Sequence, residues 1–349
     1  MRNQQYDIVK GVAIFLMVLC HAGCGQSLRN FIYLFHMAVF FIAAGWFFKR
    51  IPEISGIYKF VWVKLKRLWI PFVVYGTFVA LVHNWCFRLG FYDEGAHPVL
   101  GHLWSLRELI VHLIKGFFMA DWFYGLTGTF WFLRALFWGL LFYGISDLFL
   151  RKLSGGRVFL SILSLAILYL SQYGNERPIC YVGGANMMTA FCLIHLGVLL
   201  RAVNFKLENL NRLSALGVVI AFGFVLVGLG NFGAVNLDAN DFPNIFVLLL
   251  SSVAGWFFLC GIANLLTATF AGRMIAFLGR HTMPILLFHF AAFKLVTAIG
   301  MMFVKEGNLA GIPCSYFGWN WCIAYTIAGI FVPLGLWWVY ARVVKHEAD

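Results

Sequence analysis

The sequence predicts an all-α integral membrane protein with about ten transmembrane helices and both termini in the cytoplasm. The chain has 349 residues, of which 62% are hydrophobic and 11% are charged, whereas a soluble domain carries about 25% charged residues. Its mean hydropathy is +0.84. Apolar stretches of about 20 residues, the length that crosses a bilayer as a helix, follow one another along the chain.

These stretches assign the spans in chain order. They lie at residues 8–24, 30–48, 68–88, 129–150, 157–173, 184–202, 213–231, 245–269, 282–303 and 318–342. An even number of spans places both termini on one side of the membrane. We therefore expect residues 1–349 to form a single multi-pass domain in the cell membrane, surrounded by membrane lipid.

The lysines and arginines predict the orientation of the spans. They concentrate in segments on the side of the N-terminus, such as residues 64–67 (KLKR) and 151–157, and cytoplasmic loops carry such an excess. The same placement accounts for the net charge of +12, because the basic residues lie in short loops between apolar spans. We therefore expect no nucleic-acid partner.

The first span carries the residues that suggest a function most directly. Lys10 and His21 are eleven positions apart, which is close to three helical turns, so they share one face and lie about 16 Å apart along the axis. Asp7 lies near the same stripe. Ionisable groups in a membrane face protein or a water-filled cavity, because hydrocarbon solvates them poorly. Anchoring at the headgroups is the simpler interpretation of Asp7 and Lys10, whereas we interpret His21 as functional.

Two further groups are placed at the depth of His21. His36 opens the second span and Arg134 lies about one turn into the fourth, and both spans descend from the outer side. A histidine is suited to general base catalysis, and an arginine to binding an oxyanion or a carboxylate. The alternatives are an interfacial cap for His36 and a snorkelling side chain for Arg134. The sequence thus predicts an outer polar layer, for which Trp131 provides a floor.

The longest loop, residues 89–128, falls on the outer side. Between Trp104 and Met119, apolar residues recur at helical spacing: Leu106, Leu109, Ile110, Leu113 and Phe117. This pattern predicts an amphipathic helix. Such a helix either lies in the membrane interface or covers an outward-facing site as a lid, and the pattern leaves both possibilities open.

On the inner side, Lys66, Arg67 and Arg151 join Lys10 as groups able to bind a polyanion such as a nucleotide phosphate. Ordinary positive-inside charge is the alternative explanation for them.

Eight cysteines are present, and no pair combines metal-ligand spacing with supporting histidines. We therefore predict no metal site. A disulfide bond among Cys24, Cys180 and Cys314 is left open by the sequence.

Five features of the sequence occur in a distinctive order. They are Lys10 placed eleven positions before His21, residues 35–45 (FHMAVFFIAAG), residues 66–71 (KRLWIP), residues 131–137 (WFLRALF) and residues 278–289, which end in His289. Their order and spacing resemble the membrane proteins of acyltransferase family 3 over almost the whole chain. The family has an arginine or a related basic residue at the first of these positions and the pattern FHMPLFFFxSG on the second helix. Here Lys10 stands in place of arginine, and a lysine does not make bidentate phosphate contacts. Ala38 and Ala44 replace the proline and the serine.

The resemblance implies an enzyme that takes an acyl group, most commonly acetyl, from cytosolic acyl-CoA. The acceptor is a hydroxyl of a glycan or glycolipid on the outer side. Under this interpretation His21 takes the proton of that hydroxyl or briefly carries the acyl group. His36 or Arg134 orients the partners, and Asp7 pairs with Lys10. The inner residues Lys10, Lys66, Arg67 and Arg151 hold the CoA phosphates.

A membrane transporter or exporter of a glycan or lipid-linked intermediate is the alternative function. That class predicts broken helices and paired repeats, and neither is evident in the sequence. A purely structural scaffold leaves the buried charges without a role.

Overall fold

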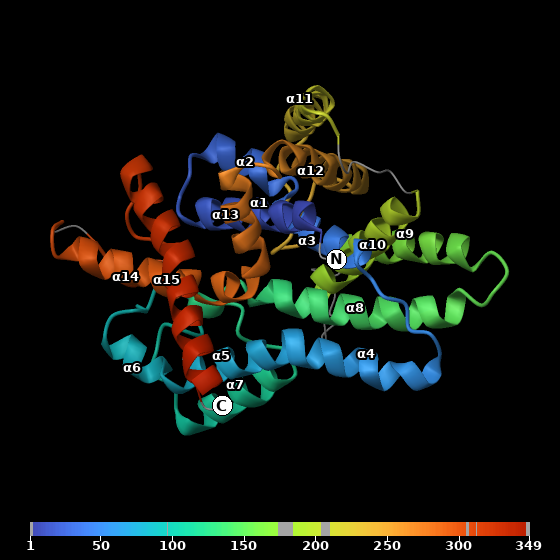
Figure 1. Cartoon of the computed structure of the whole chain (residues 1–349). Helices are drawn as coiled ribbons and strands as arrows, with labels where there is room; N and C mark the ends of the chain where they lie inside the picture. Colours follow the sequence, from blue (N-terminus) through green and yellow to red (C-terminus); the bar gives the residue numbers. More distant parts are fainter. Residues whose placement is uncertain are drawn as a thin grey trace.

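The structure, a computed structural model, describes residues 3–95, 97–173, 184–203, 210–304, 307–311 and 313–346. The regular secondary structure of this part of the chain is helical, with one β-bridge between Asn236 and Asp241. The prediction of an all-α fold is therefore confirmed. Figure 1 shows the helices surrounding α1, which lies near the middle of the bundle.

The helices have the following bounds. They are α1 Gln4–His21, α2 Gln26–Tyr33, α3 His36–Trp46, α4 Ile57–Lys64, α5 Ile70–Leu81, α6 His83–Arg88, α7 Leu106–Phe117, α8 Phe130–Leu150, α9 Gly156–Tyr173, α10 Gly184–Ala202, α11 Arg212–Gly230, α12 Ile245–Leu266, α13 Phe270–Arg280, α14 Thr282–Met301 and α15 Trp319–His346. A π-helical turn, Leu65–Trp69, joins α4 to α5. Short 3-10 turns lie at Ile54–Gly56 and Gly125–Thr127.

Seven helices in the described part of the chain are long and apolar enough to cross a membrane. They are Gln26–Trp46, which comprises α2 and α3, together with α8, α10, α11, α12, α14 and residues Trp319–Val343 of α15. The chain is thus a multi-pass membrane protein, whereas the count of ten spans and the orientation of the termini remain predictions. The predicted span 68–88 is wrong in its bounds. Its helix begins at Ile57, ends at Leu81 and is followed by the separate helix α6.

Two glycines fix the position of α1. This helix contacts α3, α12, α13, α14 and α15, and its closest neighbour is α13. A Cβ atom on Gly11 would lie 2.0 Å from the carbonyl oxygen of Ile275, and one on Gly279 would lie 1.7 Å from that of Asp7. Only residues without a Cβ allow two helix backbones to approach so closely. The pair α1–α13 therefore holds the ionisable stripe of α1 at a defined depth and rotation.

A second pair of glycines brings the backbones of α3 and α10 into close contact. A Cβ atom on Gly45 would lie 1.9 Å from the carbonyl oxygen of Ile194, and one on Gly197 would lie 2.1 Å from that of Ile42. By contrast, α11 packs against α12 at one edge of the bundle (Figure 1), and only 17% of its span is buried. Among the seven candidate spans, α11 has the smallest buried share, so most of its surface faces outward.

The segment 89–128 contains the predicted amphipathic helix, which is α7. Ser105 and Glu108 form a capping box at its start. Hydrogen bonds from Ser105 and His102 to its carboxylate lower the pKa of Glu108 to about 2. After the helix, the buried Asp121 accepts hydrogen bonds from His112 and from the hydroxyl of Tyr124, each 2.5 Å long. The next residue, Trp122, stacks on Phe72 of α5 with 5.7 Å between the ring centroids, so the segment packs against that helix.

Candidate active site

A cavity of about 420 Å³ opens at the end of α1 where His21 lies. We call it the histidine cavity, because His21 and His36 line it. Its polar lining residues also include Arg29, Tyr33, His97, Tyr124, Asn236 and Asp238. They come from α1, α2, α3 and two loops that are far apart in the sequence, so the cavity forms only when the bundle closes. Its volume lies in the range of small-molecule binding sites.

His21 is the last residue of α1, and its half-buried ring faces the histidine cavity. The ring packs edge-on against Phe290, with 5.1 Å between the centroids, and lies 5.5 Å from the ring of His289. Among the described residues, none forms a hydrogen bond with the His21 ring in the structure. Its nitrogens are therefore available to a molecule bound in the cavity.

The predicted stripe on α1 lines two cavities in succession. Lys10, Ile14 and Met17 line a second cavity, while Met17 and His21 line the histidine cavity. The spacing of four, three and four residues keeps these side chains on one helix face. The prediction that Lys10 and His21 share a face is thus confirmed. Between these two residues the stripe is apolar, because Ile14 and Met17 occupy it.

His36 follows a break in the second span. Leu34 and Phe35 separate α2 from α3, and His36 is the first residue of α3. Its Nδ1–H donates a hydrogen bond of 2.9 Å to the carbonyl oxygen of Ile32. In the neutral ring this leaves Nε2 as a hydrogen-bond acceptor. His36 therefore caps the end of α2, in line with the capping role that the sequence left open, and it also lines the histidine cavity.

A third histidine completes this layer. His289 of α14 is fully buried, and its Nδ1 lies 2.9 Å from the carbonyl oxygen of Ile285 and 3.1 Å from that of Leu286. Donation from Nδ1–H to these carbonyls defines the tautomer and leaves Nε2 unprotonated. The sequence marked His289 as the end of a motif and gave it no role. Its place behind His21 depends on the packing of α14 against α1.

Arg134 lies beside the histidine cavity and outside its lining. Its guanidinium packs on the ring of Phe123, 4.0 Å from the centroid, and donates a 3.2 Å hydrogen bond to Asn186. The amide of Asn186 in turn donates to the carbonyl oxygens of Leu237 and Asp238, at 2.9 and 2.6 Å. Through this chain of contacts, Arg134 braces the loop between α11 and α12 against α10.

That loop places Asp238 in the cavity wall. Asn236 and Asp241 close it with two backbone hydrogen bonds of 2.7 and 2.9 Å, and Asn240 holds it to α10 through a 2.5 Å hydrogen bond with Thr189. Although Asp238 is exposed to the cavity, the surrounding protein displaces enough water to raise the pKa of its carboxyl to about 6, and the positive charge of Arg134 opposes that rise. Asp238 was missed as a site residue, although it is an acid in an outer loop without basic residues.

The segment 89–128 supplies the opposite wall. His97 and Tyr124 both line the cavity, and their rings stack with 4.9 Å between the centroids. Asp121 holds the hydroxyl of Tyr124, as described above. The segment therefore contributes to the site through its loops, while α7 lies outside the lining. No periodicity in the sequence identifies either residue.

The second cavity has a volume of about 340 Å³ and is almost entirely apolar. We call it the apolar cavity. Lys10 and Arg67 are its basic residues, and Lys10 forms a 2.9 Å ion pair with the buried Asp7. The expected pairing of these two residues is thus present. Two of the four predicted phosphate-binding residues therefore line the same cavity.

The other two lie elsewhere. The ammonium group of Lys66 packs over Trp62 on the exposed face of the helix, 5.0 Å from the ring centroid. Arg151 pairs with Asp147 at 3.4 Å and donates to the carbonyl oxygens of Ile51 and Pro52. Arg151 thereby ties the connection after α3 to the end of α8. A separate pocket of about 560 Å³ nearby is lined by Lys49, Arg50, Arg157 and Arg201.

The structure also bears on metal sites and disulfide bonds. Within the described ranges, no group of three or more histidine, cysteine, aspartate or glutamate side chains is arranged to hold a metal ion. Cys24 and Cys314 are free thiols, and Cys180 lies outside the described residues. The Sγ atoms of Cys20 and Cys24 are 3.9 Å apart.

Comparison with known protein families gives a match over most of the chain. A family model for acyltransferase family 3, described as an acyltransferase domain, matches residues 3–341. The searches of curated proteins and of solved structures gave no match. The matched range includes both cavities and every helix that lines them.

Proposed function

This chain belongs to acyltransferase family 3, and from that premise we propose that it is a membrane O-acyltransferase. It moves an acyl group, acetyl in the first instance, from acyl-CoA to a hydroxyl of a glycan or glycolipid. The single observation that carries the proposal is the α1 stripe. One helix face carries a basic group, Lys10, and an imidazole, His21, which line two cavities that share Met17 in their walls.

The proposal assigns the two cavities to the two substrates. Acyl-CoA enters from the cytosol at the basic end, where Lys10 and Arg67 contact its phosphates and the apolar cavity takes its pantetheine arm. The acceptor binds from the outer side in the histidine cavity, whose hydroxyl, imidazole and carboxylate groups suit a carbohydrate. The separation of Lys10 and His21 along α1, about 16 Å, is the depth that the arm covers.

The reaction is a direct acyl transfer. His21 accepts the proton of the acceptor hydroxyl while its oxygen attacks the thioester carbonyl carbon, and a C–O bond forms. The resulting tetrahedral intermediate breaks its C–S bond. The CoA thiolate then leaves and takes up the proton from His21, which restores the neutral imidazole. A transient acyl-imidazole on His21 is the alternative sequence of steps, and it predicts exchange of label between acetyl-CoA and free CoA without acceptor.

His289 and His36 support this chemistry in different ways. His289 packs against the His21 ring and fixes its orientation. His36 presents its Nε2 to the cavity from the start of α3, where it orients the acceptor through a hydrogen bond. Arg134 acts through Asn186 by holding the loop that carries Asp238.

Membranes that contain the chain provide the test, because they retain the native acceptor. Membranes supplied with acetyl-CoA labelled in the acetyl group should accumulate label that mild alkali releases, as expected for an O-acyl ester. The variant His21→Ala should lower this rate by roughly 10²–10⁴-fold. His102→Gln is the control, because this exposed histidine pairs with Glu108 and lies outside both cavities.

The outcome also separates this function from transport. The second span is broken before His36, and broken helices occur in transporters. A transporter moves its glycan without consuming acetyl-CoA. Flux across vesicles that is independent of acetyl-CoA, together with unchanged label in the His21→Ala variant, would overturn the proposed function.

A further inference from the structure

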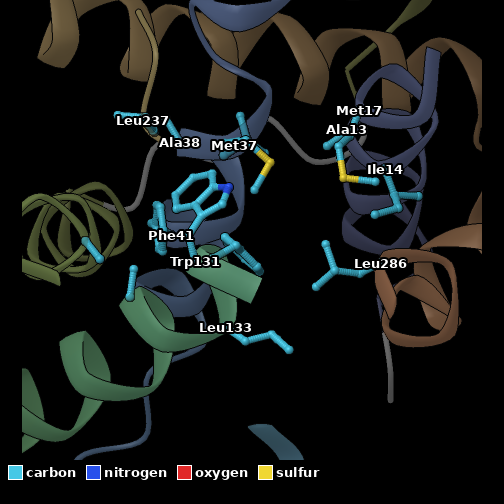
Figure 2. Packing of buried hydrophobic residues seen from close by; sticks show 14 of the residues in the cluster. Ala13, Ile14, Met17, Met37, Ala38, Phe41, Trp131, Leu133, Leu237 and Leu286 are labelled. Atoms are coloured by element: carbon cyan, nitrogen blue, oxygen red, sulfur yellow. The ribbon is translucent and has the colours of Figure 1, made fainter. Parts of the chain in front are cut away.

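Three side chains belong to the walls of both cavities. They are Met17 of α1, Met37 of α3 and Leu286 of α14, and we call them the neck. All three are buried, with 1%, 7% and 5% of their surface exposed. Figure 2 shows them pointing from three separate helices towards one central space. These three side chains therefore stand between the two cavities.

The environment changes at the neck. On one side, the apolar cavity is lined by residues such as Ile14, Phe40 and Leu133, and its basic residues are Lys10 and Arg67. On the other side, the wall contains His21, His36 and other polar groups. The neck itself has no polar atom apart from the sulfur atoms of its methionines. Such surroundings solvate ions poorly and offer water molecules few hydrogen-bond partners.

The composition of the neck suits a chain that passes through it. Methionine is unbranched and has three side-chain torsions, so it turns aside at low cost and closes again. Leu286 is branched, and its backbone carbonyl accepts a 3.1 Å hydrogen bond from the hydroxyl of Thr129. A single unbranched chain can displace two methionine side chains, whereas a branched or ring-shaped group must also move Leu286 and the backbone behind it.

We propose that Met17, Met37 and Leu286 form a selective neck that admits unbranched acyl thioesters and excludes branched or aromatic acyl groups from His21. This inference rests on the proposed acyltransferase function, since it concerns the donor of that reaction. The acyl group leads the pantetheine arm through the neck, so its cross-section decides entry. Its length matters less, because the linear arm itself occupies the neck during transfer.

The test compares straight and branched donors. In the same membranes, release of CoA is measured with acetyl-CoA, butyryl-CoA and isobutyryl-CoA. The wild-type chain should use butyryl-CoA at least tenfold better than isobutyryl-CoA. Met37→Ala and Leu286→Ala should each lower the ratio of butyryl-CoA to isobutyryl-CoA use by tenfold or more, because a widened neck admits the branched acyl group. Ile42→Ala is the matched control, since Ile42 is buried on α3 and lies outside both cavities, and its ratio should stay near that of the wild type.

A second variant tests the flexibility of the neck. Met37→Leu keeps the side-chain volume and removes the unbranched, flexible chain. It should lower kcat for acetyl-CoA while leaving the unfolding temperature within the range of the wild type. If the wild type releases CoA but the ratio of butyryl-CoA to isobutyryl-CoA use is the same in the wild type and in all neck variants, the selective neck is refuted. The proposed acyltransferase function then still stands. No release of CoA by the wild type would overturn both.

Discussion

The imidazole rings of His21 and His289 lie 5.5 Å apart between their centroids, with an angle of 38° between their planes. His21 faces the histidine cavity, whereas His289 is buried behind it and bound to two backbone carbonyls of its own helix. His289, which is held by its own helix, therefore sets the position of the His21 ring. Contact between α14 and α1 is required for this arrangement, so it joins the two ends of the chain in one site.

His289→Phe should lower kcat on the order of 10- to 100-fold and leave the KM for acetyl-CoA within twofold. Phenylalanine keeps the aromatic contact and removes the hydrogen bonds that fix the ring. Steady-state kinetics at several acetyl-CoA concentrations separate the two parameters. A variant with wild-type kcat, or one whose activity loss follows only from a lower unfolding temperature, would contradict a positioning role.

Lys10→Ala should raise the KM for acetyl-CoA roughly tenfold, because one charge-assisted hydrogen bond to a phosphate is lost. Arg67→Ala should act in the same direction. Binding of free CoA, measured by calorimetry, checks this without turnover. Lys59→Ala is the control, since Lys59 is exposed on α4 and lies outside both cavities.

Lys66→Ala tests the part of the sequence prediction that the structure leaves undecided. Lys66 packs on Trp62 and is absent from the lining of the apolar cavity. Its loss should change CoA binding by less than twofold. An effect as large as that of Lys10→Ala would instead extend the phosphate site along the exposed face of the helix.

Asp238→Asn should change how stability depends on pH. Because the folded pKa of about 6 lies above the usual value of 3.8, the folded state binds more protons than the unfolded state between these values. Stability contributed by this carboxyl is therefore lost as the pH rises from about 4 to 6. The unfolding temperature of Asp238→Asn, relative to that of the wild type, should rise across this window. Glu94→Gln, at an exposed position, is the control, and parallel curves for Asp238→Asn and the wild type would rule out the raised pKa.

Gly279→Ala should destabilise the fold by at least about 1–3 kcal/mol, the cost of overpacking a close contact. The new Cβ would lie 1.7 Å from the carbonyl oxygen of Asp7, so α1 and α13 must separate. Gly217→Ala is the matched control on α11, where a Cβ meets no heavy atom within 4 Å. The measurement is the unfolding temperature in detergent. Equal values for the two variants would show that the α1–α13 contact is looser than in the structure.

The sequence by itself determined the helical membrane class, the family resemblance and the shared face of Lys10 and His21. Each of these depends on local properties: apolar length, motif order and the period of one helix. Hydropathy was less reliable for boundaries. The predicted span 68–88 was displaced, because a π-helical turn at residues 65–69 continues the helix backwards to Ile57.

Only the tertiary structure decided which residues share a cavity. Arg134 and Asp238 are more than one hundred positions apart, and their association through Asn186 depends on how α8 and α10 pack. The same is true of the neck, whose three residues come from three helices. A sequence specifies the depth of a side chain along its own helix. The rotation and separation of neighbouring helices follow from close glycine contacts, which sequence periodicity does not reveal.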